Sequence, residues 1–226
     1  MKKIKSFQAV LFDADGTLYD STMLHFEAYR KVIQELCNFD FSEKLFFDEV
    51  IGNYKKPPQI MMELGIPCDK DEFYVRKRKY YQEIAAKKLQ PTQGLIPFLE
   101  ILQKHKIPCG IVSGASSNSL EDSLNILKIS HYFDQKITFE DCPQQQKPNP
   151  FPYEIALKKM NINPAETLAF EDTKSGIESA QAASIFCIGI NNTTNTSREL
   201  QKVAIIIQNY DDLKYQIGKG LTLELI

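Results

Sequence analysis

From residue 91 onward, the sequence alternates between short apolar runs and longer stretches with helical periodicity. This alternation predicts an α/β fold with a doubly wound, mostly parallel sheet, because a helix after each strand carries the chain back across the sheet. The apolar runs predict strands at Ala9–Phe12, Pro108–Val112, Lys136–Phe139, Thr167–Phe170, Phe186–Ile190 and Val203–Ile207. The periodic stretches predict helices at Leu95–Lys104, Ser117–Leu127, Pro150–Met160, Lys174–Ala183 and, in a short form, Tyr210–Tyr215.

Residues 21–89 interrupt this pattern directly after the first strand. They carry no strand pattern, and a first helix is predicted by apolar residues at helical spacing: Leu24, Ala28, Val32 and Leu36. Further helices are predicted near 45–50, at Gln59–Leu64 and from Asp69 to about Lys88. The sequence therefore predicts two domains, a core formed by 1–20 and 90–226 and an inserted all-helical domain formed by 21–89.

Composition limits the classes of partner. The 226 residues carry a net charge of −2, with 43% hydrophobic and 25% charged residues, which is ordinary for a soluble protein and gives no case for nucleic acid or a membrane surface. No apolar stretch approaches the ~20 residues of a membrane span, and the apolar run after Met1 ends at Asp13, too early for an export signal. Five scattered cysteines without a Cys-x-x-Cys pair favour a reducing compartment. We expect a cytoplasmic monomer.

Two carboxylates follow the first predicted strand. Asp13 and Asp15 leave the end of Ala9–Phe12 together and precede Gly16, which permits a sharp turn, and the hydroxyl of Thr17. Ligands of open parallel sheets bind outside the carboxyl ends of the strands. Paired carboxylates there suit a divalent cation and phosphoryl chemistry, whereas the alternative is an ordinary acidic turn.

Two further strand ends carry polar groups. Ser113 and Gly114 follow Pro108–Val112 and could bind an anion through a hydroxyl and backbone N–H groups, although simple helix capping by Ser116 or Ser117 is the alternative. Glu171 and Asp172 follow Thr167–Phe170. Adjacent carboxylates there are costly unless a cation compensates them, and the alternative is an acid-rich helix N-terminus.

Lys147 lies between Gln146 and Pro148, and a second proline follows at Pro150. The two prolines stiffen the backbone beside the lysine, which would help to fix the position of its ammonium group. A solvated surface lysine is the alternative.

Together these motifs resemble those of the haloacid dehalogenase superfamily. The matching segments, in order, are Asp13-Ala14-Asp15-Gly16-Thr17, Ser113, Lys147-Pro148-Asn149-Pro150 and Glu171-Asp172-Thr173-Lys174-Ser175-Gly176-Ile177, with Thr173 where relatives have serine. The resemblance spans Phe7 to Ile190 and is to the branch of phosphoglycolate phosphatase-like and β-phosphoglucomutase-like enzymes. It implies a Rossmann-like core with an inserted helical cap.

The resemblance also implies an activity, that of a Mg²⁺-dependent phosphatase acting on a small phosphorylated metabolite through an aspartyl-phosphate. Asp13 would be the nucleophile and Asp15 the general acid and base. Ser113 and Lys147 would hold the transferring phosphoryl group. Further substrate contacts are expected from Gly16, Thr17 and Gly114. The expected Mg²⁺ ligands are the side chains of Asp13, Glu171 and Asp172 and the backbone carbonyl of Asp15.

Two alternatives remain open at this stage. A phosphomutase of the same branch would use the same aspartates, and His25 lies where those mutases have a histidine. Their cap motif Gly-x-Ser-Arg is here Gly52-Asn53-Tyr54-Lys55, and lysine lacks the bidentate fork of arginine, so a phosphatase is favoured. His25 and Lys55 are still candidate substrate-binding residues. The alternative of another class is a non-catalytic protein that binds a phosphorylated ligand, which the complete set of turnover residues disfavours.

Overall fold

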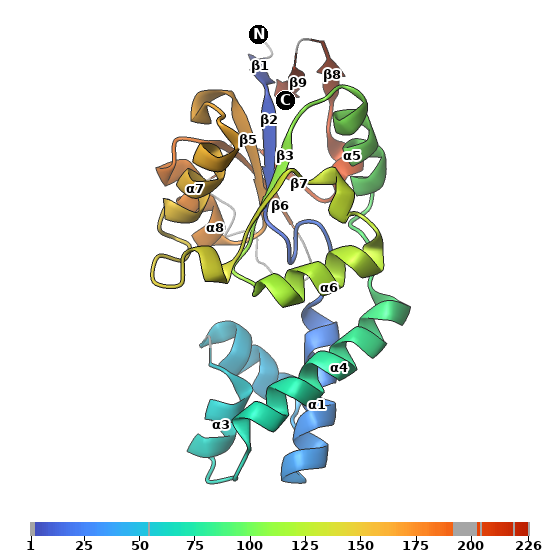
Figure 1. Ribbon diagram of the computed structural model, residues 1–226, viewed down its shortest axis with the longest axis vertical. Coiled ribbons are helices and arrows are strands. Elements are labelled where there is room, and N and C mark those ends of the chain that lie inside the picture. Colours follow the sequence, from blue (N-terminus) through green and yellow to red (C-terminus); the bar gives the residue numbers. More distant parts are fainter. Residues whose placement is uncertain (1–2, 54, 192–202, 204, 219, 226) are drawn as a thin grey trace. The chain divides into compact units, whose positions relative to one another are not determined.

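The computed structural model describes residues 3–53, 55–191, 203, 205–218 and 220–225 (Figure 1). The chain divides into two compact units: one is formed by Met1–Asp20 and Gln90–Ile226, and the other by Ser21–Leu89. The first unit contains the sheet that carries the polar motifs, and the second is built from helices in its described residues. No helix in the described residues is long and apolar enough to span a membrane.

The first unit is built on a six-stranded parallel sheet with the strand order β4-β3-β2-β5-β6-β7. The strands are β2 (Ala9–Phe12), β3 (Cys109–Val112), β4 (Gln135–Ile137), β5 (Thr167–Glu171), β6 (Phe186–Ile190) and β7 (Ile206–Ile207). The chain runs outward from β2 to β4 and then returns to the other side of β2, so the winding reverses between β2 and β5. The predicted doubly wound parallel fold is confirmed, and such a reversal is where α/β sheets place their ligands.

In the described residues, the helices that connect the strands are α5 (Leu95–Lys104), α6 (Ser117–Leu127), α7 (Phe151–Met160) and α8 (Lys174–Ala182). Short 3₁₀ turns lie at Ser130–Tyr132, Phe139–Asp141, Pro164–Glu166 and Tyr210–Asp212. Successive residues of each strand point to opposite faces of the sheet. Leu11 and Ala169 therefore pack with α7 and α8 in one buried cluster, whereas their neighbours Phe12 and Phe170 face the opposite side.

An aromatic cluster forms that opposite face. Phe12 stacks on Phe170 with ring centroids 5.4 Å apart. Phe98 of α5 meets Phe170 edge-on at 5.8 Å, and Tyr210 lies 5.2 Å from the same ring. Large aromatic rings bury much apolar area, so this cluster fixes α5 on the two central strands and thereby the ends of those strands.

A second sheet was not expected from the sequence. Strands β1 (Lys3–Phe7), β9 (Leu221–Leu225) and β8 (Tyr215–Ile217) form an antiparallel sheet in the order β1-β9-β8. The predicted short helix Tyr210–Tyr215 is wrong, because a 3₁₀ turn covers only Tyr210–Asp212 and Tyr215 begins β8. A strand at this place is stabilised by pairing with β9 and by the contact of Tyr215 with Phe98, which a local pattern does not reveal. The predicted strand Val203–Ile207 is described only in part, since residue 204 lies outside the described residues.

The second unit contains α1 (Thr22–Cys37), α2 (Glu43–Leu45), a π-helical segment (Phe46–Gly52), α3 (Pro57–Glu63) and α4 (Lys70–Lys88). Its core is a cluster of buried side chains that includes Phe26, Ile33, Phe41, Phe46 and Phe73. Asp69 begins α4, because its carboxylate accepts hydrogen bonds from the backbone N–H groups of Asp71 and Glu72. The unit therefore has its own apolar core and its own helix signals.

Candidate active site

Three central strands end at one edge of the sheet with polar residues. Asp13 follows β2, Ser113 follows β3, and Glu171 ends β5, with Asp172 directly after it. Because β2 lies between β3 and β5, these residues converge. The backbone N–H of Asp13 donates to the carbonyl of Phe170 at 2.9 Å, which ties the first motif to the last.

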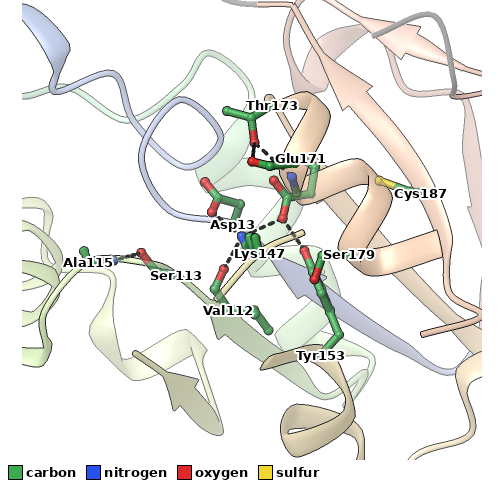
Figure 2. Close-up of polar contacts among 12 residues, drawn as sticks. Asp13, Val112, Ser113, Ala115, Lys147, Tyr153, Glu171, Thr173, Ser179 and Cys187 are labelled. Atoms are coloured by element: carbon green, nitrogen blue, oxygen red, sulfur yellow. Dashed lines mark hydrogen bonds and ion pairs between the residues drawn. The ribbon is translucent and has the colours of Figure 1, made fainter. Parts of the chain in front are cut away.

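Lys147 lies at the centre of this edge (Figure 2). Its ammonium nitrogen Nζ contacts Asp13 Oδ1 at 2.6 Å and Glu171 Oε1 at 2.6 Å, and it donates to the carbonyl of Val112 at 2.8 Å. The segment that carries it is held by Ser179, whose hydroxyl donates to the Asn149 carbonyl at 2.6 Å. Lys147 is therefore a buried, fully engaged cation that joins two of the predicted site carboxylates.

Burial and charge act in opposite directions on these groups. Burial raises the pKa of Asp13 above its ordinary value, against the lowering effect of Lys147. Burial also raises the pKa of Glu171 to about 7, again opposed by Lys147. For Lys147 burial lowers the pKa, but Asp13 and Glu171 outweigh it and the pKa lies above its usual range. One ammonium group therefore does not fully offset the cost of burying these carboxylates.

The carboxylates form a set that fits a divalent cation. Asp13, Glu171 and Asp172 each offer one oxygen, and these oxygens lie within 4.8 Å of one another. Three carboxylates against the single ammonium of Lys147 leave a charge of −2 on the four side chains (3 negative, 1 positive). The buried Oε2 of Glu171 has no hydrogen-bond partner among the described residues. Hard cations such as Mg²⁺ bind carboxylate oxygens, and an ion of charge +2 would balance this set.

The loop after β2 forms a tight turn. Gly16 has φ +88°, a conformation that favours glycine, and its N–H donates to the Tyr19 carbonyl at 2.6 Å. The N–H groups of Thr17 and Leu18 donate to the Ala14 carbonyl. The hydroxyl oxygen of Thr17 is buried without a hydrogen-bond partner among the described residues, and Asp15 lies in the same turn, partly exposed. The turn thus leaves a buried hydroxyl available for a ligand.

Ser113 is not the cap of the following helix. Ser116 caps α6, because its hydroxyl accepts from the backbone N–H of Ser119. Ser113 is buried, its N–H donates to the Ile137 carbonyl at 2.9 Å, and its hydroxyl oxygen accepts from the Ala115 N–H at 3.1 Å (Figure 2). Gly114 is exposed beside it. The hydroxyl proton of Ser113 can therefore be donated to a ligand at this edge.

Thr173 likewise caps α8, so the pair Glu171 and Asp172 is not needed for that purpose. The Thr173 hydroxyl accepts from the Gly176 N–H at 3.1 Å. Glu171 instead ends β5 and is fully buried, and Asp172 is only 4% exposed. An acid-rich helix terminus would leave its carboxylates in water, so it does not account for this pair.

Gly176 backs the carboxylate of Glu171. A Cβ atom at position 176 would lie 1.8 Å from Glu171 Oε2, much closer than any allowed contact. We predict that Gly176→Ala displaces Glu171, weakens Mg²⁺ binding by about tenfold or more and lowers the free energy of unfolding by about 1–3 kcal/mol. Titration calorimetry and chemical denaturation measure the two effects. Gly218→Ala is the control, since no atom lies within 4 Å of a Cβ there. Equal behaviour of the two variants would contradict the prediction.

The two remaining candidates, His25 and Lys55, lie in the helical unit. His25 stacks on Tyr81 with ring centroids 4.4 Å apart, and burial together with Lys77 holds the pKa of His25 well below its ordinary value. Lys55 Nζ pairs with Glu49 at 2.9 Å and with Glu63 at 2.7 Å. The charge of Lys55 is therefore balanced by two glutamates of its own unit. Residue 54 of the same motif lies outside the described residues.

Sequence reasoning missed two groups that contact the cluster and one that supports it. The carbonyl of Val112 accepts from Lys147, and the hydroxyl of Tyr153 donates to Glu171 at 2.6 Å. Ser179 instead holds the lysine segment through the Asn149 carbonyl. Val112 lies at a strand end but contributes a backbone carbonyl, and Tyr153 and Ser179 lie inside helices. Only the fold brings them to the site.

Comparison with known proteins identifies the family. The sequence model of the haloacid dehalogenase-like hydrolases matches residues 10–190, most of the chain. The chain belongs to this family. It is 28% identical over 202 residues to the phosphorylated carbohydrates phosphatase of Thermotoga maritima, covering 88% of this chain and 92% of that protein. It is 27% identical over 190 residues to the 6-phosphogluconate phosphatase of Escherichia coli, covering 82% and 85%.

The fold of a haloacid dehalogenase-like hydrolase is also found in solved structures. The β-phosphoglucomutase of Clostridium difficile matches with a TM-score of 0.71 at 25% sequence identity, covering 92% of this chain and 93% of that one. Similarity thus extends to phosphatases and to a mutase of one branch. The distinction between these activities depends on the residues of this chain.

Proposed function

We propose that this haloacid dehalogenase-like hydrolase is a Mg²⁺-dependent phosphatase that hydrolyses a small phosphomonoester through an aspartyl-phosphate on Asp13. The observation that carries the proposal is the contact of Lys147 with Asp13 at 2.6 Å beside the carboxylates of Glu171 and Asp172. A nucleophilic carboxylate next to a fixed cation and a divalent-metal site is what phosphoryl transfer to a carboxylate requires. Relatives that are named phosphatases and match most of this chain support the same reaction.

In the proposed reaction, Asp13 attacks phosphorus in line, and its bond to phosphorus forms as the bond to the leaving oxygen breaks. Lys147 holds the Asp13 carboxylate in one orientation and offsets negative charge on the phosphoryl oxygens. Asp15 protonates the leaving oxygen, and its conjugate base then takes a proton from the water that attacks the aspartyl-phosphate. The second step releases inorganic phosphate and restores Asp13.

The remaining core residues bind the phosphoryl group in this proposal. Ser113 donates its hydroxyl proton, the Gly114 N–H is a second donor at the same strand end, and Thr17 supplies its hydroxyl from the turn after β2 that Gly16 makes possible. The side chains of Asp13, Glu171 and Asp172 and the carbonyl of Asp15 would hold Mg²⁺. When bound, the ion neutralises carboxylate and phosphoryl charges that otherwise repel each other.

In the helical unit, His25 and Lys55 are kept as candidate substrate-binding residues. Relatives named for phosphorylated carbohydrates and 6-phosphogluconate make a sugar phosphate the first class to test. A phosphatase is favoured over a mutase because the ammonium of Lys55 is already paired with Glu49 and Glu63. A mutase must hold a second phosphate group, for which a free arginine fork is better suited.

The test is phosphate release from a panel of phosphomonoesters with Mg²⁺, in parallel with a chelator. We expect release that depends on Mg²⁺, falls at least tenfold with the chelator and returns when the ion is added back. The panel includes β-glucose 1-phosphate, assayed separately for glucose 6-phosphate. Formation of glucose 6-phosphate with little free phosphate would instead establish the mutase. A folded protein that binds phosphorylated compounds without converting any of them would establish the binding protein.

A further inference from the structure

A tyrosine lies directly behind the candidate metal site without forming part of any recognised motif. Tyr153 belongs to the first turn of α7 and is fully buried. Its hydroxyl donates to Glu171 Oε1 at 2.6 Å (Figure 2). The same oxygen contacts Lys147 Nζ at 2.6 Å, so Oε1 receives one neutral donor and one charged donor. Tyr153 and Lys147 therefore share one carboxylate oxygen.

The two donors differ in how firmly they are held. Lys147 has a flexible four-carbon stem, and its ammonium group is divided among Glu171, Asp13 and the Val112 carbonyl. The Tyr153 side chain has only two rotatable bonds before its rigid ring, and the ring packs in the buried cluster with Leu11 and Ala169. The Tyr153 hydroxyl is thus the more rigidly held of the two donors to the Glu171 carboxylate.

The other oxygen of Glu171 is constrained from the opposite side. Oε2 lies where a Cβ of Gly176 would be, and it has no hydrogen-bond partner among the described residues. A buried carboxylate oxygen without a donor is costly unless a ligand meets it. The hydroxyl of Tyr153 on Oε1 and the backbone of Gly176 beside Oε2 restrict the orientation of Glu171, whose carboxylate lies close to those of Asp13 and Asp172.

Lys147 also contacts the ring of Tyr153. Its Nζ lies 5.5 Å from the centre of the Tyr153 ring, so the ring covers one side of the ammonium group. If Glu171 turned away, Lys147 would follow it or lose that contact, and its hold on Asp13 would change. A series of contacts thus runs from the tyrosine hydroxyl through Glu171 and Lys147 to Asp13.

We propose that Tyr153 is a positioning residue whose hydroxyl fixes Glu171 for cation binding and thereby keeps Lys147 on Asp13. This inference rests on the proposed function. Partners behind the ligands of metal sites commonly change metal affinity or activity by about 10–100-fold when removed.

The experiment compares Tyr153→Phe with the wild type. The variant keeps the ring and removes only the hydroxyl. We expect Mn²⁺, titrated by electron paramagnetic resonance, to bind about tenfold more weakly or worse. At limiting Mg²⁺ we expect a similar fall in kcat, with the KM for the phosphomonoester unchanged within about twofold, because the hydroxyl does not contact substrate.

The chain offers a matched control in Tyr80→Phe. The Tyr80 hydroxyl also donates to a glutamate, Glu35, at 2.6 Å, but in the helical unit and in an exposed pair. We expect this variant to bind Mn²⁺ as the wild type does. An equal effect of the two variants would overturn the proposal, as would a Tyr153→Phe protein with unchanged Mn²⁺ affinity.

A double-mutant cycle tests whether the hydroxyl acts through the glutamate. In a Glu171→Gln background, Tyr153→Phe should weaken Mn²⁺ binding no further, because the carboxylate that it positions is gone. Independent, additive losses would overturn the proposal. So would a Tyr153→Phe protein that does not fold, since the hydroxyl would then be a structural contact.

The metal measurement separates this inference from the proposed function. A wild-type protein that binds Mn²⁺ and releases phosphate, beside a Tyr153→Phe variant that does both equally well, would overturn only the role of Tyr153. A wild-type protein that binds no Mn²⁺ would overturn the proposed metal-dependent activity and this inference with it.

Discussion

Replacing Asp13 with asparagine is expected to lower kcat for phosphate release by on the order of 10⁴-fold or more while the fold is kept. Asparagine has nearly the same shape but cannot form an acyl phosphate at neutral pH. Lys147 keeps its contact with Glu171 at 2.6 Å in this variant, so the buried ammonium is not left alone. The variant should therefore keep its fold and still bind substrate. Steady-state kinetics measures the fall in kcat, and circular dichroism measures the retained fold.

Asp20→Asn is the matched control for this experiment. Asp20 is exposed and lies seven residues after Asp13 in the chain, but it is not part of the carboxylate set. We expect turnover within about twofold of the wild type. If Asp13→Asn retained most of the activity, the nucleophile would have to be another residue and the proposed mechanism would fail.

Replacing Lys147 with methionine should affect stability as well as rate. The lysine side chain is 10% exposed and the glutamate with which it pairs is 0% exposed, so its removal leaves buried negative charge uncompensated. Breaking a buried ion pair in this way costs about 3–5 kcal/mol. We expect a loss of that size in the free energy of unfolding of the chelator-treated protein. We also expect kcat to fall by about 10²–10³-fold with Mg²⁺ present.

The metal dependence of this loss is the sharper measurement. Mg²⁺ neutralises the same carboxylates, so adding it should raise the melting temperature of Lys147→Met more than that of the wild type. Lys159→Met is the control: Lys159 pairs with Asp141 at 2.8 Å, but the side chains are 43% and 27% exposed. Such a surface pair contributes at most about 1 kcal/mol. Similar losses in the two variants would contradict a buried, charge-balanced site.

The candidate site could be predicted because its residues follow apolar runs directly. Asp13, Ser113 and Asp172 each come immediately after a strand, and parallel strands present their carboxyl ends at one edge of the sheet. Lys147 follows no apolar run, and its neighbouring prolines and the resemblance to a family are what predict its role. Apolar runs and helical periodicity are local properties of a chain, so they can be read before the fold is known.

Other parts of the molecule depend on contacts between distant residues. Strand β1 pairs with β9 at the other end of the sequence, and Tyr215 lies in a strand because of β9 and Phe98. The apolar runs in β8 and β9 are too short to predict a sheet from either segment alone. The predicted helix Tyr210–Tyr215 failed for this reason, since tertiary pairing overrode a weak local pattern.

The α/β order of elements, the helical character of residues 21–89 and the polar residues at the strand ends can all be read from local sequence patterns. Three contacts depend instead on the folded structure: one ammonium group bridges Asp13 and Glu171, Tyr153 donates to the same glutamate, and Gly176 leaves room for it. Local patterns record which residues lie at a strand end. Which donor reaches which oxygen depends instead on how helices α7 and α8 pack on the sheet, and close packing fixes such contacts to fractions of an ångström.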